Sequence, residues 1–526
     1  MRGRFTPAIG VALVLLVHVT ALAWMASGTL SGFGLDDAWI FQVVARNFAA
    51  TGLLGFLPGQ VSSGATSVLW PWLLAANFRW IHADPVAYTL GLGMLCEVAA
   101  ALAILGVLRA DGWSVEWATA AACSLAASGN WLWLAVNGME AVLFVALGCA
   151  AIYAARCGRD WLCAALLTAL VLTRLEGFAL AGILVVALWW RERRLRLWPF
   201  VAAAATLLSV VVWSHATRGT WMPTTMAGRR WLAGAGVAPP SALLQLWVQR
   251  LIVLAGHVHV AELIARSALF GVAGAGLWWG CRRTTGLMTL ALWTAAQLAA
   301  YAIVLPSIGN GGRYQPMVLA LIGPWTIAGV RATRRPAVQT AVLASVVVLG
   351  LSSLIVWRGV TEAATTHINS VHRRAAAWIA AKVPAEEPIA AYDIGALAWE
   401  LPGRRVIDLG GLVDPAYLPF MRARAAWQYL DLQHVRWVAV PERAPDTPPQ
   451  IVAPLALALG LFANDRPGIE RWSASTPMAV WSVGWNSVGH AYPQIGVYEI
   501  PPGPLAAAPA DARLVALSQM PSSVNP

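Results

Sequence analysis

The chain has 526 residues, of which 59% are hydrophobic and only 12% are charged, and its mean hydropathy is +0.63. Soluble domains carry about twice that share of charge, so most of the chain is expected to be solvated by lipid. The formal net charge of +11 would suit a nucleic-acid partner, but most arginines stand in short loops between apolar runs, which favours a role in membrane orientation and excludes nucleic acid.

The charge is unevenly divided along the chain, and this predicts two domains. Residues 1–357 hold 23 basic and 11 acidic side chains, whereas residues 358–526 hold 13 and 14. We therefore expect a transmembrane domain at 1–357 and an exported α/β domain at 358–526. The six cysteines all precede residue 358 and show neither metal-ligand spacing nor a disulfide pattern. The second domain is thus expected to fold without oxidation.

Apolar runs that are long enough, or nearly long enough, to cross a bilayer predict about 11 transmembrane helices. The first run is longer than the apolar part of a usual signal peptide, so it is interpreted as an uncleaved helix. Trp39–Ala50 and Val68–Ile81 are expected to lie along the membrane interface instead. The predicted spans are Ala8–Ser27, Val86–Leu108, Trp117–Val136, Ala141–Ala155, Trp161–Thr173, Gly177–Trp190, Leu197–Trp213, Ile264–Gly280, Met288–Leu305, Gln315–Val330 and Val338–Trp357.

Arginines in alternate connections between these spans predict the orientation. The face that carries them is expected to be cytoplasmic. An odd number of spans then places the C-terminal domain on the extracytoplasmic side. The arginines are Arg2, Arg4, Arg109, Arg156, Arg159, Arg191, Arg193, Arg194, Arg196, Arg282, Arg283, Arg331, Arg334 and Arg335.

The segment after the last span has the pattern of a small α/β domain. Thr361–Lys382 predicts an amphipathic helix that stops before Pro384. Short runs of β-forming residues, separated by glycine and proline, predict strands. These strands are Pro388–Ala396, Arg405–Leu409, Arg436–Val440, Ala479–Gly484 and Ile495–Ile500.

Carboxylates, glycines and polar aromatic residues are concentrated in the connections of the predicted outer face. The cytoplasmic connections hold arginine and little else. A structural bundle does not need this separation, whereas a one-sided active site does. The outer segments are Asp36-Asp37, Asn137–Glu140, Arg174–Gly177, Trp221–Thr225 and Gly309–Tyr314.

The adjacent Asp36 and Asp37 are the strongest single signal. Two carboxylates at a membrane surface are costly unless they are hydrated or paired, and their mutual repulsion raises one of the two pKa values. One of them could then act as a general base. The alternative is that an aspartate caps the helix that follows. The presence of the other motifs on the same outer face favours the catalytic interpretation.

Several other charged residues admit two interpretations. Arg313, in a glycine-rich turn, suits a phosphate group, and Arg174 could share that task or pair with a nearby glutamate. Arg229 and Arg230 are better explained as solvated side chains. Glu97 lies in the middle of an apolar run, where it is either a functional carboxylate or a hydrogen-bonded structural group.

Taken in order, these motifs resemble the GT-C glycosyltransferases, and within them the arabinofuranosyltransferases that cap mycobacterial arabinogalactan. Leu175 replaces a proline of the family pattern, and Thr224 replaces an asparagine. The similar segments are Asp36-Asp37-Ala38-Trp39-Ile40, Asn137-Gly138-Met139-Glu140, Arg174-Leu175-Glu176-Gly177, Trp221-Met222-Pro223-Thr224-Thr225 and Gly312-Arg313-Tyr314 with Pro316.

The resemblance implies an inverting glycosyltransferase. It would move a sugar, with arabinofuranose as the best match, from a polyprenyl-phosphate donor to a hydroxyl of an extracytoplasmic glycan or glycoprotein. Asp36 or Asp37 would deprotonate that hydroxyl, and Arg313 and Arg174 would hold the donor phosphate. The lipid phosphate is already a good leaving group, so no strong general acid is needed. The residues that would shape the site are Glu140, Glu176, Tyr314, Trp39, Asn137 and Thr224.

The same resemblance implies the inner membrane of a bacterium, with the bilayer as a partner and the site on its outer side. Nothing in the sequence requires a metal ion or another cofactor.

Other functions remain open at this point. Within the same fold, the sugar could be mannose, another hexose or aminoarabinose, and the acceptor lipid A, pilin or a capsule. A transporter or flippase of lipid-linked sugars would predict broken helices or paired repeats near the midplane, and the sequence indicates neither. A membrane scaffold would not need the Asp36-Asp37 pair together with Arg313.

Overall fold

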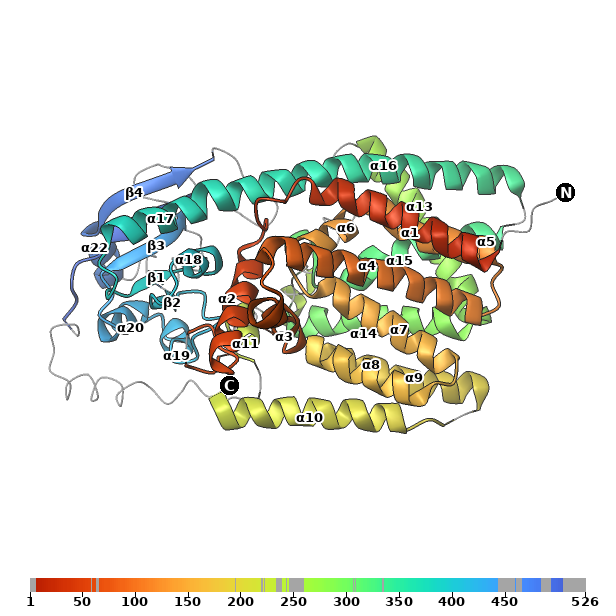
Figure 1. Ribbon diagram of the computed structural model, residues 1–526, viewed down its shortest axis with the longest axis horizontal. Helices are drawn as coiled ribbons and strands as arrows, with labels where there is room; N and C mark the ends of the chain where they lie inside the picture. The colour runs from red at the N-terminus through yellow and green to blue at the C-terminus, as the bar shows by residue number, and fades with distance from the viewer. Residues whose placement is uncertain are drawn as a thin grey trace.

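The computed structural model shows a helical bundle joined end to end with a small α/β domain (Figure 1). It describes residues 6–57, 59–62, 66–193, 195–218, 221, 223–232, 239–242, 244–245, 260–305, 307, 309–333, 335–442, 459, 466–483 and 493–504.

Most described residues of the first part are helical. The elements are α1 (Pro7–Ala26), α2 (Asp36–Thr51), α3 (Leu69–Ala76), η1 (Asn77–Ile81), α4 (Pro85–Ala110), α5 (Val115–Cys123), η2 (Ser124–Ala127), α6 (Gly129–Val136), α7 (Ala141–Arg156), α8 (Asp160–Thr173), η3 (Leu175–Gly177), α9 (Phe178–Glu192), α10 (Trp198–Arg218), α11 (Thr224–Leu232), α13 (Val260–Arg283), α14 (Thr285–Val304), η4 (Asn310–Gly312), α15 (Pro316–Ala332) and α16 (Pro336–His367).

Every one of the predicted spans contains helix, but not every one is a single long helix. By length and composition, five helical segments among the described residues can cross a membrane: α1, α4, α10, α14 and α16 with its continuation. The bent pair α6 and α7 would make a sixth, while α8 and α15 are shorter apolar helices. The bundle is therefore built from apolar helices of unequal length.

The predicted span Trp117–Val136 is wrong as a single helix. It is divided into α5, the 3₁₀ turn η2 and α6, and α6 then meets α7 at an angle of 107°. Gly138 lies at this bend with a φ of +83°, a conformation that side chains with a Cβ rarely adopt. A Cβ there would come within 2.8 Å of Ala38 and 2.9 Å of Phe33. Close packing against the segment around α2 suits this bend, which lies in the predicted connection Asn137–Glu140. The division of the predicted span at η2 was not predicted.

The last helix of the bundle continues without interruption into the second domain. α16 passes the proposed boundary after Trp357, turns through the π-helical segment η5 (Ile368–His372) and proceeds as α17 (Arg373–Lys382). A separate amphipathic helix from Thr361 is therefore not observed. The predicted stop before Pro384 is confirmed, because α17 ends at Lys382.

The α/β domain contains a five-stranded sheet in the order β2-β1-β3-β5-β4. β1 is parallel to β2 and β3, whereas β5 is antiparallel to both β3 and β4. All five predicted strands are present, although the first is shorter than expected because a helix begins at Gly395. The elements are β1 (Ile389–Ala391), α18 (Gly395–Glu400), β2 (Val406–Asp408), α19 (Leu418–Arg422), α20 (Ala426–Leu432), β3 (Trp437–Glu442), α22 (Arg466–Ser473), β4 (Thr476–Ser482) and β5 (Gln494–Glu499).

Helix α2 belongs to both hydrophobic cores. Trp39 and Phe41 are buried in the core of the bundle, while Ile40 and Val44 are buried in the core of the α/β domain. The segment predicted as an interfacial helix therefore lies between the two parts, next to α3 and α18 (Figure 1). Burial of apolar side chains on two faces fixes the bundle and the domain relative to each other.

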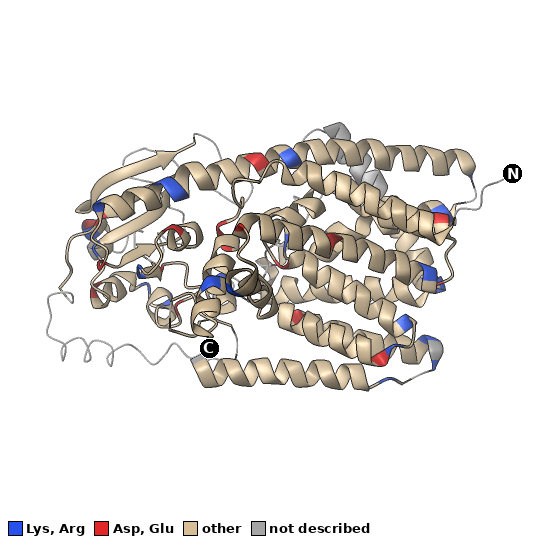
Figure 2. Ribbon diagram, viewed as in Figure 1, with Lys and Arg blue, Asp and Glu red and all other residues tan. Residues whose placement is uncertain are grey.

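Basic side chains gather at the end of the bundle that lies away from the α/β domain (Figure 2). Arg156 pairs there with Asp111, with 3.1 Å between the atoms, and Arg191 donates to the carbonyl of Arg282 over 3.1 Å. Connections that the sequence assigned to one face thus lie together. Four of the predicted arginines fall outside the described residues: Arg2, Arg4, Arg194 and Arg334.

Glu97 is a hydrogen-bonded structural group. Its carboxylate lies 2.7 and 2.8 Å from Nδ1 of His18 and accepts from Nε1 of Trp131 over 3.1 Å. Nε2 of His18 lies 3.1 Å from the carbonyl of Ala122 and must be its donor, because a carbonyl only accepts. This fully buried network joins α1, α4, α5 and α6.

Replacement of Glu97 is expected to weaken the bundle. Glu97→Ala leaves buried polar atoms of His18 and Trp131 without a partner, which should cost about 3 kcal/mol or more of unfolding free energy. Glu97→Gln keeps an acceptor and a donor at the same place and should cost much less. Thermal unfolding in detergent measures both, and equal losses in the two variants would contradict this account.

Candidate functional site

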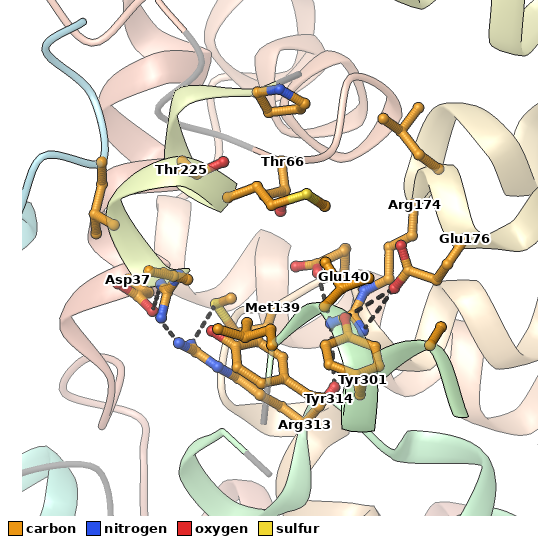
Figure 3. A pocket seen from close by; sticks show the side chains of 18 of the residues that line it. Asp37, Thr66, Met139, Glu140, Arg174, Glu176, Thr225, Tyr301, Arg313 and Tyr314 are labelled. Carbon is orange, nitrogen blue, oxygen red and sulfur yellow. Dashed lines mark hydrogen bonds and ion pairs between the residues drawn. The ribbon is translucent and has the colours of Figure 1, made fainter. Parts of the chain in front are cut away.

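A cavity of about 340 Å³ opens where the bundle meets the α/β domain. It is lined by α2, α11 and α14, by the turns that precede α7 and α15, by the turn around η3, and by Leu412 of the α/β domain. Figure 3 shows two groups of charged side chains in it: Asp37 and Arg313 lie together, and Glu140, Arg174 and Glu176 form a second group.

The first group consists of one carboxylate and two guanidinium groups. Arg229 and Arg313 both contact the same oxygen of Asp37, Oδ2, and the distance from Arg229 is 2.7 Å. Burial alone would raise the pKa of Asp37, but the charges of Arg313 and Arg229 hold that pKa well below its usual range. The group therefore carries one positive charge in excess.

A glycine-rich turn positions Arg313. Gly309, Gly311 and Gly312 have φ values of +66°, +60° and +81°, which residues with a Cβ rarely adopt. A Cβ on Gly311 would approach the ring of Trp133 to 2.0 Å. The turn can therefore fold tightly against the bundle and direct the buried Arg313 side chain into the cavity.

The second group is built around Arg174. Its guanidinium pairs with Glu140 at 2.8 Å and lies 3.7 Å from Glu176, which also accepts from the hydroxyl of Tyr301 over 2.9 Å. Arg174 further donates to the backbone carbonyl of Arg313 over 3.1 Å. This group carries one negative charge in excess, and it supports the turn that presents Arg313.

Several buried polar atoms of the cavity-lining residues have no hydrogen-bond partner among the described residues. A buried polar group without a partner is costly, so these atoms favour a polar occupant that supplies partners. They are Oε2 of Glu140, Nη1 of Arg174, Oγ1 of Thr225, Nε of Arg313 and the hydroxyl of Tyr314.

Asp36 points away from the cavity and joins α2 to the α/β domain. Its two carboxylate oxygens accept from the backbone N–H groups of Gly395 and Ala396, over 2.7 and 2.8 Å. Asp36 therefore caps α18 and not the helix that it begins. Ten residues later, Arg46 donates to the carbonyls of Ala398 and Trp399 at the other end of α18, at 3.1 Å each.

The two aspartates thus have different surroundings although they are adjacent in sequence. Burial and the nearby carboxylate of Asp393 raise the pKa of Asp36 to about 7. Asp37 keeps its charge through its two arginines. Of the pair, only Asp37 lines the cavity.

The structure brings together most of the expected site residues. Trp39 does not line the cavity but packs between Phe33 and Trp399. Asn137 is also buried away from it, where its side chain accepts from the backbone of Met139. Thr224 begins α11, and its side chain lies outside the described part of the structure. The expected residues that do line the cavity are Asp37, Arg174, Arg313, Glu140, Glu176 and Tyr314.

The expectation that Arg229 is merely solvated is wrong, because this side chain pairs with Asp37 and lies over the ring of Tyr314. The neighbouring Arg230 is exposed, as predicted. Thr225 and Arg229 are four residues apart, so both lie on one face of α11. This spacing, at the end of the Trp221–Thr225 motif, is the signal that could have identified Arg229. Met139, Tyr301 and Leu412 also line the cavity and carried no signal of their own.

No group of three or more His, Cys, Asp or Glu side chains is placed to hold a metal ion in the part of the chain that the structure describes.

Comparison with solved structures shows that the overall fold is similar to those of two other proteins. The structure of ArnT from Cupriavidus metallidurans bound to undecaprenyl phosphate matches with a TM-score of 0.55 and 14% identity, over 95% of this chain and 99% of that chain. AglB, the oligosaccharyltransferase from Archaeoglobus fulgidus, in complex with an inhibitory peptide and a dolichol-phosphate, matches with a TM-score of 0.53 and 12% identity, over 95% and 75%. Both are membrane glycosyltransferases, and the predicted GT-C fold is confirmed.

Other comparisons are less informative. Residues 360–489 match a family model described as a domain of unknown function (DUF8728). No curated protein sequence matches the chain. Arabinofuranosyltransferase AftD from Mycobacteria has a TM-score of 0.44 over 42% of that chain, which is too low to support the predicted branch.

The surroundings of Asp36 predict a pH effect on stability. Between about pH 4 and pH 7 the folded protein retains a proton on Asp36 that the unfolded chain has released, so the stability that this group contributes falls as the pH rises through that window. Asp36→Asn removes the titration and should flatten this part of the pH profile. Thermal unfolding at pH 5, 6 and 7 measures it, and identical slopes in the wild type and the variant would contradict the prediction.

Proposed function

We propose that this protein is an inverting glycosyltransferase that takes a sugar from a polyprenyl-phosphate donor and transfers it to a hydroxyl group of an acceptor. The observation that carries the proposal is Asp37 paired with Arg229 and Arg313 in a cavity at the junction of the two domains. A carboxylate beside two guanidinium groups supplies a proton acceptor and a phosphate site in one place. The similarity in fold to ArnT and AglB, whose structures hold polyprenyl phosphates, supports the same class of donor.

The two arginines of the first group hold the donor phosphate. Guanidinium groups bind phosphate oxygens through paired N–H donors, and the group of Arg229, Arg313 and Asp37 has a positive charge in excess. Arg174, which the sequence suggested as a second phosphate ligand, is occupied by Glu140 and by the carbonyl of Arg313. Its role in this proposal is therefore to position Arg313.

Asp37 accepts the proton of the acceptor hydroxyl. The hydroxyl oxygen forms a bond to the anomeric carbon from the side opposite the phosphate. The bond from that carbon to the phosphate oxygen breaks, and polyprenyl phosphate leaves with the bonding electrons. Asp37 then releases the proton to water. Because the phosphate carries the negative charge away, no acid is needed at the leaving group.

The remaining lining suits the rest of the donor. Glu140, Thr225 and Tyr314 have polar atoms without a hydrogen-bond partner in the described part of the chain, and these atoms fit the hydroxyls of a sugar ring. Leu175 and Pro223 are shared with a small neighbouring cavity beside α10, whose walls are mainly apolar. That side is a suitable exit for an isoprenoid chain.

The finer assignments rest on the sequence. Arabinofuranose is the sugar that the motifs match best, and mannose, another hexose or aminoarabinose are the alternatives. The acceptor is a glycan or glycoprotein on the outer side of a bacterial inner membrane. The arginines at the far end of the bundle support this orientation, since positive connections face the cytoplasm.

One observation favours the transporter alternative. The bend of 107° between α6 and α7 is a broken helix of the kind that transporters use near their substrate site. In this protein the bend carries Glu140, which supports Arg174 in the proposed catalytic site. A transfer assay separates the two functions, because a transporter leaves the bond to the phosphate intact.

The central prediction is that the purified protein transfers labelled sugar from one member of a panel of polyprenyl-phosphate donors. Asp37→Asn should lower kcat by about 10²–10⁴-fold, because a general base contributes about that much. Arg313→Gln and Arg229→Gln should lower kcat/KM for the donor, because both hold its phosphate. Initial rates with varied donor measure all three effects.

Two matched controls accompany these variants. Arg230→Gln removes the same charge from the exposed neighbour of Arg229, and Glu362→Gln removes an exposed carboxylate outside the cavity. Both should retain wild-type rates. Failure of every donor, or full activity of a folded Asp37→Asn variant, would overturn the proposal.

A further inference from the structure

The pairing of Asp37 conflicts with its use as a base. Both guanidinium groups contact its Oδ2 atom, and Arg313 is only 2% exposed while Asp37 is 20% exposed. Among the described residues, Asp37 is the only carboxylate with which Arg229 and Arg313 form ion pairs. A carboxylate held between the buried Arg313 and the half-buried Arg229 is strongly stabilised in its charged form and accepts a proton poorly.

The donor carries the group that can resolve this conflict. The phosphate of a sugar-linked polyprenyl donor is a diester with one negative charge, which equals the excess positive charge of Asp37, Arg229 and Arg313. Its oxygens are better partners for guanidinium groups than a single carboxylate oxygen that two arginines share. A phosphate that enters this group therefore competes directly with Asp37 for both arginines.

We propose that Asp37 and the donor phosphate bind Arg229 and Arg313 alternately, so that the base becomes available only when the donor is in place. This inference rests on the proposed function and adds an order of events to it. In the empty site the arginines neutralise Asp37. When the phosphate draws them away, Asp37 is freed beside the acceptor hydroxyl.

The alternation also resets the site after transfer. Asp37 has then taken the proton of the acceptor, and polyprenyl phosphate, now a monoester, holds the arginines. When this product leaves, the arginines return to Asp37 and favour its ionised form, so the proton passes to water. No other reactant is needed, and the protein ends the cycle in the state in which it began.

The test is the binding of undecaprenyl phosphate, which needs neither the sugar nor the acceptor to be known. If Asp37 competes with phosphate, Asp37→Asn should bind undecaprenyl phosphate about tenfold more tightly than the wild type, although it is inactive in transfer. Arg313→Gln should bind at least tenfold more weakly. Glu362→Gln, which changes the net charge in the same way as Asp37→Asn at an exposed position, should bind like the wild type.

The outcomes separate this inference from the function on which it rests. If the wild type does not bind undecaprenyl phosphate, the proposed donor class is wrong. If the wild type binds it but Asp37→Asn binds equally or more weakly, the alternation is wrong while the proposed donor class stands. Thermal unfolding of each variant verifies that it is folded, and Asp37→Ala provides the same comparison if Asp37→Asn is unstable.

Discussion

The arrangement of this protein depends on the contact between α2 and α18. α2 lies beside the short helix α18 and binds both of its ends: Asp36 accepts from the first N–H groups of α18, and Arg46 donates to carbonyls near its C-terminus. Asp36 thus supplies acceptors to free N–H groups at one end of α18, and Arg46 brings a positive charge to the carbonyls at the other end. The contact is so close that a Cβ on Gly395 would lie 2.0 Å from the carbonyl of Asp36. Because Asp36 is fixed in this way, the next residue, Asp37, is directed to the cavity. The position of Asp37 in the site thus depends on a contact between the two domains.

The cavity is organised by charges that are nearly balanced. One group has a positive charge in excess, the other a negative charge, and the hydrogen bond from Arg174 to the carbonyl of Arg313 connects them. Charges in such a place are costly unless they are paired, and each of these side chains has an oppositely charged partner. A phosphate with one negative charge would bring the first group to a net charge of zero. This arrangement suits the anionic lipid of the proposed function without a large net charge in the cavity.

Much of the fold could be predicted from local pattern. Apolar runs gave helices at all expected ranges, and β-forming runs gave all five strands, because each is a property of neighbouring residues. The division of one predicted span at η2 and the continuous path from α16 through η5 to α17 depend on packing between distant segments and were not predicted. The site shows the same difference between what local sequence pattern predicts and what long-range packing determines. Asp37, Arg313 and Glu140 stood out through their motifs, whereas the role of Arg229 depends on how α11 lies against α2, and the capping role of Asp36 depends on a helix about 360 residues further along the chain.

The helical segment from Pro336 to Lys382 has 47 residues, and at 1.5 Å per residue it is about 70 Å long. The hydrocarbon core of a bilayer is only about 30 Å thick. More than half of this rod must therefore stand outside the hydrocarbon. The C-terminal end of this helical segment packs in the core of the α/β domain. The segment therefore determines the distance between that domain and the lipid. In the proposed reaction, the acceptor hydroxyl would therefore have to reach a cavity that lies between the membrane and a domain held at this height.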